Sequence, residues 1–205
     1  MKRFECLQAI APLIDRELFV TTAGGATAEW NALRPSDGNI QVKTLGLCSS
    51  IGLRPCHRAF PSAKFSSSTA TALLWMNLGS LATIGLHQPK NLIHICWDNQ
   101  QYESSGGEPT VATAGKIDFA GVARNAGIQS SSAAATVDEL KQAVIHALEP
   151  RRTAFHLGAH RSRPRRSPPL RYDELENKYR FIRYIEDSEG INILRVPMPA
   201  SYLQK

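Results

Sequence analysis

The segment NLIHICW (91–97) constrains the fold more than any other part of the chain. It is an apolar run of strand length, and such runs are typical of strands that are buried on both faces of a parallel sheet. The polar residues DNQQYESSGGEPTVATAG follow it and predict a long loop at the carboxyl end of that strand. Because parallel strands need crossover connections, we expect an α/β fold.

Helical and strand-like patterns alternate on both sides of this run. We expect helices at about 3–10, 28–33, from 45, at 118–125 and at 137–148, and further strands at 17–22 and 40–42. This alternation indicates a parallel sheet with crossover helices. Ligands of such sheets bind beyond the carboxyl ends of the strands, so Asp98, Asn99 and the glycines of the following loop are candidate binding residues.

The composition is that of an ordinary globular protein, with 42% hydrophobic and 20% charged residues. No apolar run approaches the roughly 20 residues that span a bilayer. The start MKRFECLQAIAPLIDRE is interrupted by acids and is not expected to be a secretory signal, so we expect a cytoplasmic protein without a membrane partner. The cysteines Cys6, Cys48, Cys56 and Cys96 are scattered, which argues against a zinc or disulfide framework.

The net charge of +6 comes from one segment, RRTAFHLGAHRSRPRR (151–166), which holds six arginines and no acid. Without these arginines, the basic and acidic residues of the chain balance. A nucleic-acid binder that uses this segment is one alternative, and it would show strongly salt-dependent affinity. We do not expect it, because the arginines lack interleaved aromatic residues and belong to no recognisable binding module.

The segment KFSSSTATALLWMNLGS (64–80) raises a conflict between composition and position. Its second half is apolar with a helical rhythm, whereas its first half holds five small hydroxyl residues among alanines. An α/β chain needs a buried apolar strand at this place. A strand without large apolar side chains loses about 1.5 to 3 kcal/mol of folding stability for each such side chain that is not buried. We therefore expect the protein to be only marginally stable.

Six segments of the chain carry a resemblance to a known family. They are RFECLQAIAPL at the start, TLGLCSSIGL (44–53), WMNLGSLATIG (75–85), PKNLIHICWDNQQYESSGGEPT (89–110), DFAGVARNAGI (118–128) and ENKYRFIRYIEDSEGI (176–191). In this order they resemble the β subunit, or diphosphate-binding domain, of thiamine-diphosphate-dependent sulfopyruvate and phosphonopyruvate decarboxylases. The resemblance implies an α/β three-layer sandwich with a central, mostly parallel sheet. We expect a core at 1–150, a basic loop at 151–171 and a C-terminal arm at 172–205.

The resemblance also implies a set of cofactor-binding residues. Enzymes of this family hold Mg²⁺ and thiamine diphosphate with a GDG motif, a later asparagine and a nearby backbone carbonyl. Asn99 matches the asparagine and Gln101 the carbonyl, whereas Thr71 stands where the metal-binding aspartate should be. Further cofactor-binding residues implied in this way are Leu45, Gly46, Glu103, Gly106 and Gly107.

The absence of the GDG motif can be explained at the level of the codons. If SSSTATAL is written with codons that end mostly in G or C and is read two nucleotides later, the translation is VVDGDGA, a strand followed by the motif. We therefore interpret residues of about 54–75 as translated out of frame. The segment before SPPLRYDELENKYRF is a second candidate for such a change, with a solvated basic loop as the alternative.

The resemblance implies a decarboxylase of a 2-oxo acid, either sulfopyruvate or phosphonopyruvate, that releases CO₂ and leaves an aldehyde. The pyrimidine-binding α subunit would complete the active site, so a heteromer is expected. Because a threonine lacks the charge of an aspartate, we expect weak cofactor binding or none. The alternative is a non-catalytic or degenerate product that at most binds a partner subunit.

Overall fold

The computed structural model describes residues 1–54, 65–102, 106–110, 117–148, 153–160 and 173–194. Six parallel strands form the central sheet in the order β2-β1-β3-β4-β8-β7. Their bounds are β1 Leu18–Thr22, β2 Asn39–Val42, β3 Phe65–Ala70, β4 Leu92–Asp98, β7 Ser130–Ala134 and β8 Ala154–Ala159. A short antiparallel pair, β5 Gln101–Tyr102 and β6 Glu108–Pro109, lies outside this sheet.

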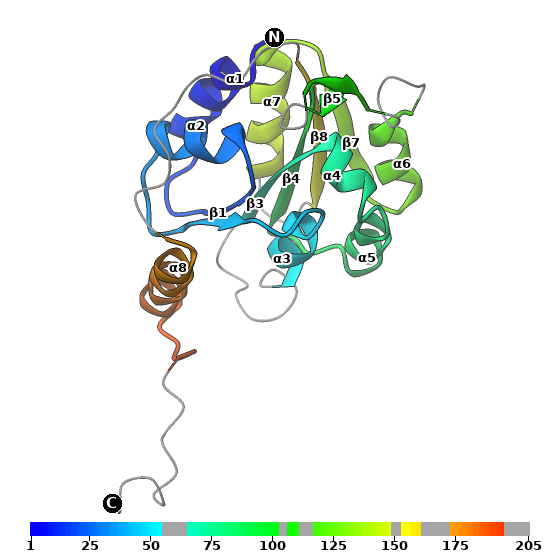
Figure 1. The fold of residues 1–205 in the computed structure, drawn as a ribbon. Coiled ribbons are helices and arrows are strands. Elements are labelled where there is room, and N and C mark those ends of the chain that lie inside the picture. Colours follow the sequence, from blue (N-terminus) through cyan, green and yellow to red (C-terminus); the bar gives the residue numbers. More distant parts are fainter. Residues whose placement is uncertain (55–64, 103–105, 111–116, 149–152, 161–172, 195–205) are drawn as a thin grey trace, which may run out of the picture.

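Helices cover both faces of the sheet, so the fold is the expected three-layer α/β sandwich (Figure 1). One face packs against α1 Arg3–Ile10, α2 Gly25–Leu33 and α7 Val137–Leu148. The other packs against α3 Cys48–Arg54, α4 Thr71–Trp75, α5 Gly79–His87 and α6 Phe119–Asn125. A short 3₁₀ helix, Ala11–Leu13, follows α1, and helix α8 is Glu174–Glu189.

Alternate residues of β4 point into the two layers and explain its apolar sequence. Ile93, Ile95 and Trp97 belong to the core under α1, α2 and α7. Leu92 and Cys96 belong to the core on the opposite face. A strand that is buried on both sides has no solvent face for polar residues, which is why the run NLIHICW predicted its place correctly.

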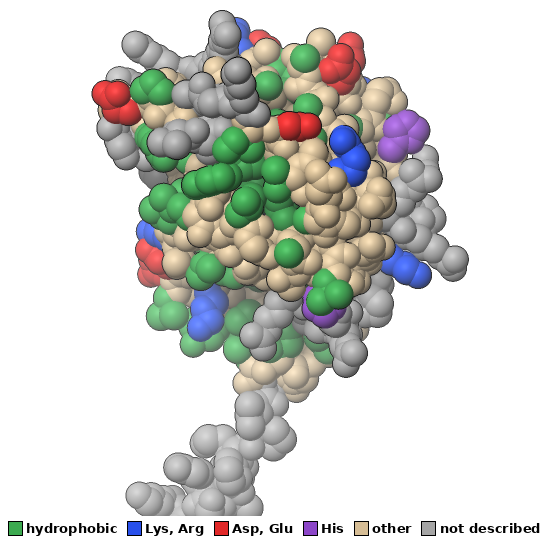
Figure 2. Space-filling view, turned by 90° about the vertical axis from the view of Figure 1, so that its right-hand side faces the viewer, with side chains coloured by type: hydrophobic (Ala, Val, Ile, Leu, Met, Phe, Trp, Pro, Cys, Tyr) green, Lys and Arg blue, Asp and Glu red, His purple; other side chains and the backbone are tan. Residues whose placement is uncertain are grey.

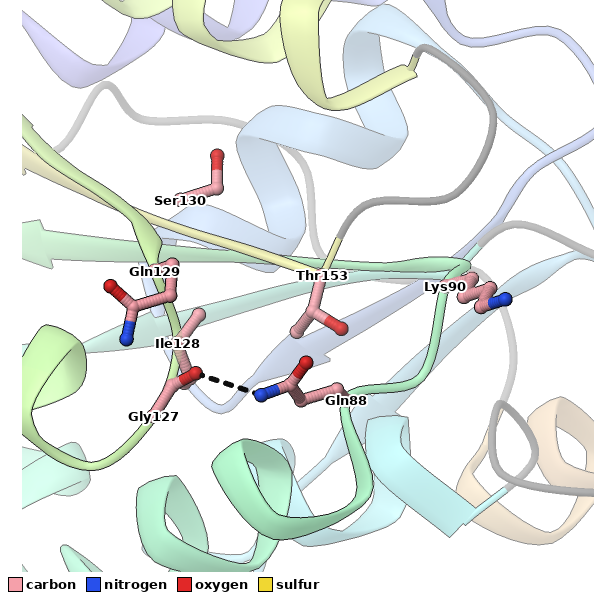
Figure 3. A pocket seen from close by; sticks show the side chains of 7 residues that line it. All are labelled: Gln88, Lys90, Gly127, Ile128, Gln129, Ser130 and Thr153. Atoms are coloured by element: carbon pink, nitrogen blue, oxygen red, sulfur yellow. Dashed lines mark hydrogen bonds between the residues drawn. The ribbon is translucent and has the colours of Figure 1, made fainter.

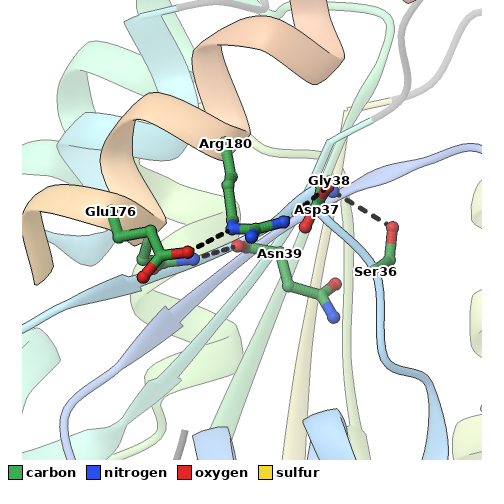
Figure 4. Close-up of polar contacts among 7 residues, drawn as sticks. Ser36, Asp37, Gly38, Asn39, Glu176 and Arg180 are labelled. Carbon is green, nitrogen blue, oxygen red and sulfur yellow. Dashed lines mark hydrogen bonds and ion pairs between the residues drawn. The ribbon is translucent and has the colours of Figure 1, made fainter. Parts of the chain in front are cut away.

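Helix α8 covers the β2 edge of the sheet. The Asn177 side chain accepts a hydrogen bond from the Gln41 backbone N–H at 3.0 Å and donates one to the Asn39 carbonyl at 2.9 Å. Arg180 bridges Glu176 on its own helix and Asp37 in the turn before β2, at 2.8 and 3.5 Å (Figure 4). These contacts cap an otherwise open strand edge, which protects it from pairing with other chains.

Several predicted elements are confirmed, and two differ at their starts. Helices α1 and α7 have the predicted bounds, and β1, β2, β4 and α6 lie within one residue of theirs. Helix α2 begins at Gly25, three residues before the expected start. Helix α3 begins at Cys48 rather than near Leu45, because Gly46 has a φ of +82° and so cannot continue a helix.

The serine-rich segment does form a strand, and it lies in the middle of the sheet. Strand β3 pairs in parallel with β1 on one side and with β4 on the other. The proposed change of reading frame falls partly on residues 55–64, which lie outside the described residues, as does Cys56. The side chains of Cys6, Cys48 and Cys96 are buried.

The expected basic loop at 151–171 is wrong for residues 154–159. These residues form β8, a buried strand between β4 and β7. The apolar residues AFHL lie between two groups of arginines, so the charge of the flanking residues concealed a strand. In the described part of the chain, no helix combines the length and the apolarity that crossing a membrane requires.

Candidate functional site

The sheet changes its direction of growth between β1 and β3. From β1 the chain moves to β2 on one side, and it then returns to β3 on the other side. In open parallel sheets, such a switch point opens a crevice at the carboxyl ends of the strands. The candidate site follows β3 and β4 at this edge.

Strand pairing brings Thr71 to the residues that follow β4. Ala70, the last residue of β3, is in register with Trp97. The next residues are therefore neighbours, and the Thr71 hydroxyl donates a hydrogen bond to Asp98 Oδ1 at 3.3 Å. Thr71 is buried, with 1% of its surface exposed. The asparagine that follows Asp98 thus lies at the edge where the Ser/Thr segment ends, as the expected site requires.

Two tight turns fix the start of the loop after β4. Asp98 Oδ1 accepts a hydrogen bond from the Gln100 backbone N–H at 3.0 Å, and Asn99 Oδ1 accepts one from the Gln101 N–H at 3.3 Å. Gln100 has a φ of +59°, which turns the chain sharply here. The loop then folds back on itself, since the Thr110 N–H donates to the Gln100 carbonyl at 3.1 Å. Asn99 and Gln101 are therefore held at the edge of the sheet.

The loop glycines adopt conformations that favour glycine. Gly106 and Gly107 have φ values of +106° and +87°. A Cβ on Gly106 would meet no atom within 4 Å, so its backbone faces open space. Backbone that is free of Cβ atoms can approach an anion closely. Glu103, the remaining predicted residue of this loop, lies outside the described residues.

Leu45 and Gly46 lie beside the end of α4. The Asn77 side chain donates to the Gly46 carbonyl and to Ser50 Oγ, both at 2.9 Å. A Cβ on Gly46 would be 3.3 Å from the Cβ atoms of Met76 and Asn77, so only glycine fits here without displacement. Leu45 itself is 55% exposed. Its position beneath a cofactor stays a prediction.

Buried histidines near the site were not predicted from the sequence. His160 follows β8, and its backbone N–H donates to the Asp98 carbonyl at 2.7 Å. Burial, helped by Arg3 and the N-terminal amine, lowers the pKa of His160 to about 4. His94 on β4 lies 3.2 Å from Ser49 Oγ, and burial lowers its pKa to about 4 as well. Both rings are thus neutral at pH 7. The position of His160 could not be predicted from the sequence, because it depends on the register of β8 with β4.

A cavity of about 310 Å³ opens at the same edge, lined by Met1, Asp98, Gln100, Ala135, Ala159 and His160. A second cavity, of about 420 Å³, lies at the opposite edge (Figure 3). There Gln88 donates to the Gly127 carbonyl at 3.2 Å, beside Lys90 and Thr153. None of the predicted site residues lines this second cavity. The carboxyl edge therefore remains the candidate site.

The donors at the carboxyl edge suit a hard divalent cation. They are the Asp98 carboxylate, the Asn99 amide oxygen, the Thr71 hydroxyl and the Gln101 carbonyl. Mg²⁺ binds such oxygen ligands and retains several waters. The described residues include no group of three or more histidine, cysteine or acidic side chains that could hold a metal without help from a ligand. Magnesium that is shared with a diphosphate fits this donor set.

Comparison with known proteins finds similarity to thiamine pyrophosphate enzymes. Residues 65–156 match the family described as thiamine pyrophosphate enzyme, C-terminal TPP binding domain. The fold also matches a candidate thiamin diphosphate-dependent enzyme from Mycobacterium smegmatis, with a TM-score of 0.59 over 80% of this chain and 32% of that one. At 11% sequence identity, this likeness shows the fold alone.

Curated relatives include both single-chain decarboxylases and separate subunits. The phosphonopyruvate decarboxylase of Streptomyces viridochromogenes is 32% identical over 131 residues, which cover 63% of this chain and 32% of that protein. The sulfopyruvate decarboxylase subunit beta of Methanococcus maripaludis is 28% identical over 189 residues, which cover 91% of this chain and 98% of that subunit. The subunit beta of Methanocaldococcus jannaschii is 32% identical over 53% of this chain and 58% of the subunit. This chain thus spans about a third of the phosphonopyruvate decarboxylases that it matches.

Proposed function

We propose that this chain is the diphosphate-binding subunit of a 2-oxo acid decarboxylase. The proposal rests on the homology of the chain to sulfopyruvate decarboxylase β subunits and phosphonopyruvate decarboxylases, and on its thiamine-pyrophosphate-binding domain. The observation that carries the proposal is the pairing of β3 with β4. It brings position 71 and the Asp98–Gln101 turn together at the carboxyl edge. Sulfopyruvate and phosphonopyruvate are the substrates that these relatives suggest, with CO₂ and an aldehyde as products.

The residues of this chain bind and orient rather than react. Asn99 and the Gln101 carbonyl would hold Mg²⁺, while Gly106 and Gly107, together with Glu103, would close over the diphosphate. Thiamine diphosphate, when bound, supplies the carbanion-stabilising chemistry of decarboxylation. Leu45 and Gly46 would support it from the side of α3. The protein thereby fixes the position of the cofactor at the sheet edge.

We propose a pyrimidine-binding α subunit as the partner. The match covers 98% of the Methanococcus maripaludis protein, which is named as the beta subunit of a sulfopyruvate decarboxylase, and this supports a partner subunit for the chain. Exposed apolar side chains flank the site, namely Leu45, Leu47, Ile51, Trp75 and Met76, each 37% or more exposed. Figure 2 shows hydrophobic side chains gathered together on one face of the molecule. A patch of this kind supports a protein interface.

The altered segment should weaken the cofactor site. Thr71 brings no charge, and Ala70 and Ala72 stand where the GDG motif has glycines, so Cβ atoms lie where the backbone would approach a diphosphate. A reading frame that is shifted over about 54–75 would explain these differences. Because of Thr71, a non-catalytic subunit that at most binds its partner is the second candidate.

Restoring the motif tests the proposal. The variant Ala70→Gly/Thr71→Asp/Ala72→Gly is titrated with thiamine diphosphate and Mg²⁺ in a calorimeter, beside the unaltered chain. We expect the restored variant to bind saturably and more tightly than the unaltered chain. Adding Asn99→Ala to the restored variant should weaken binding by about tenfold or more. A restored variant that binds no cofactor contradicts the proposal.

A further inference from the structure

Position 71 lacks a carboxylate, but Asp98 brings one to the same place. The two side chains come from neighbouring strands and are joined by the hydrogen bond from Thr71 Oγ1 to Asp98 Oδ1, at 3.3 Å. Asp98 is fixed further by the Gln100 N–H, 3.0 Å from the same oxygen. Both hydrogen bonds go to Oδ1, which leaves Oδ2 for a further ligand.

The burial and the charge of the Asp98 carboxylate bear on what it can bind. It is half-buried, and no ion pair joins it to a described lysine or arginine. A carboxylate that is partly removed from water and forms no salt bridge favours a cation beside it.

The surroundings of Asp98 also provide the other requirements of a magnesium site. Asn99 follows it directly, and the Thr71 hydroxyl oxygen retains lone pairs while its proton points to Asp98. Asp98 also borders a cavity of about 310 Å³, whose lining includes neither Asn99 nor Thr71. A single carboxylate, one amide and one hydroxyl are few ligands, so a diphosphate must complete the shell.

We propose that Asp98 supplies the metal-binding carboxylate that position 71 lacks, and that Asp98, Asn99 and Thr71 together hold the divalent cation of the bound diphosphate. This inference rests on the proposed function. It makes the cofactor site of this chain weaker than one with an aspartate at position 71, but retained. The carboxylate would come from the end of β4 instead of from the position that follows β3.

Manganese binding tests the inference without any assay of activity. Mn²⁺ replaces Mg²⁺ as a probe, and the loss of its free signal in electron paramagnetic resonance is measured with thiamine diphosphate present. The proteins are the unaltered chain, Asp98→Asn, Thr71→Asp and the double variant Thr71→Asp/Asp98→Asn. Asp118→Asn is the matched control, because this exposed aspartate caps α6 away from the site, where its Oδ1 accepts from the Gly121 N–H at 2.9 Å.

We expect the unaltered chain and Asp118→Asn to bind Mn²⁺ equally, and Asp98→Asn to bind it about tenfold more weakly or worse. Thr71→Asp in the Asp98→Asn background should restore binding, which a merely misfolded Asp98→Asn protein could not show. Equal binding by Asp98→Asn and the unaltered chain overturns the inference. The inference is also overturned if only the proteins that carry Thr71→Asp bind Mn²⁺, but that result leaves the proposed function standing. If none of the proteins binds Mn²⁺, Thr71→Asp included, both the inference and the proposed function are overturned.

Discussion

Gly85 on α5 and Gly127 before β7 pack backbone against backbone. A Cβ on Gly85 would lie 1.7 Å from the Ala126 carbonyl oxygen, and one on Gly127 would lie 3.1 Å from the Gly85 oxygen. Gly127 also has a φ of +104°. This contact sets how closely α5 approaches the turn between α6 and β7, and so supports the face of the sheet on which α4 begins.

Gly85→Ala should destabilise the protein. Its methyl group has no room, because the obstructing atoms belong to the backbone, so we expect a loss of about 3 kcal/mol in the free energy of unfolding. Gly79→Ala is the control, since a Cβ at this α5 position meets nothing within 4 Å. Urea unfolding of both variants checks the prediction. Equal midpoints for the two would show that α5 can move away without cost.

Arg3 and Glu29 form a buried ion pair between α1 and α2. Arg3 Nε lies 2.8 Å from Glu29 Oε2, and their side chains are only 7% and 2% exposed. Glu29→Gln leaves the guanidinium buried without its counter-charge and should lower the free energy of unfolding by about 3 kcal/mol or more. The apolar double variant Arg3→Met/Glu29→Leu should recover much of that loss. Chemical denaturation of the three proteins tests this, and a double variant no more stable than Glu29→Gln would argue against it.

Stability should fall as the pH is lowered from about 6.5 to about 4. Burial holds the pKa of His94 at about 4, whereas an unfolded histidine titrates near 6.5. Between pH 6.5 and about 4, the unfolded chain therefore binds a proton at His94 that the folded chain does not bind. The free energy of unfolding thus falls as the pH is lowered through this range. His94→Gln, which keeps a partner for Ser49, should flatten the dependence of the urea midpoint on pH. An unchanged slope would assign the effect to other groups.

Polar substitution of the exposed apolar patch should impair subunit association without unfolding the chain. Trp75 and Met76 are 45% and 58% exposed at the end of α4, so Trp75→Gln/Met76→Gln removes little of the core. Leu86→Gln on α5 is the matched control, because Leu86 is 79% exposed outside the patch. The α subunit of the Methanococcus maripaludis enzyme serves as the probe in analytical ultracentrifugation. We expect the unaltered chain and Leu86→Gln to form a complex, and the double variant to form less.

Much of the fold could be predicted from the sequence where burial leaves a periodic pattern. Helix α7 has a well-defined apolar stripe, with Leu140, Val144 and Ala147 buried, and its bounds were correct. Strand β4 was clear because both of its faces are buried. Strand β7 was not found, since SSSAA has neither an apolar run nor an apolar alternation and lies at the edge of the sheet.

The candidate site could be predicted only in part. Asp98, Asn99 and the loop glycines were named from their place after β4, whereas Gln101 was named from the family resemblance. The contact between Thr71 and Asp98 depends on the register of β3 with β4, which no local pattern in the sequence contains. Tertiary pairing also overrode composition in β3, where five of the six residues FSSSTA are small and yet form a central strand.

A crystal structure of the unaltered chain grown with Mg²⁺ and thiamine diphosphate would show whether the carboxyl edge holds the cofactor. We expect a diphosphate at the carboxyl edge, with its metal about 2.1 Å from the Asn99 amide oxygen and within coordination distance of Asp98. Diphosphate bound instead in the cavity beside Lys90 at the opposite edge, or a carboxyl edge occupied only by water, would contradict this expectation.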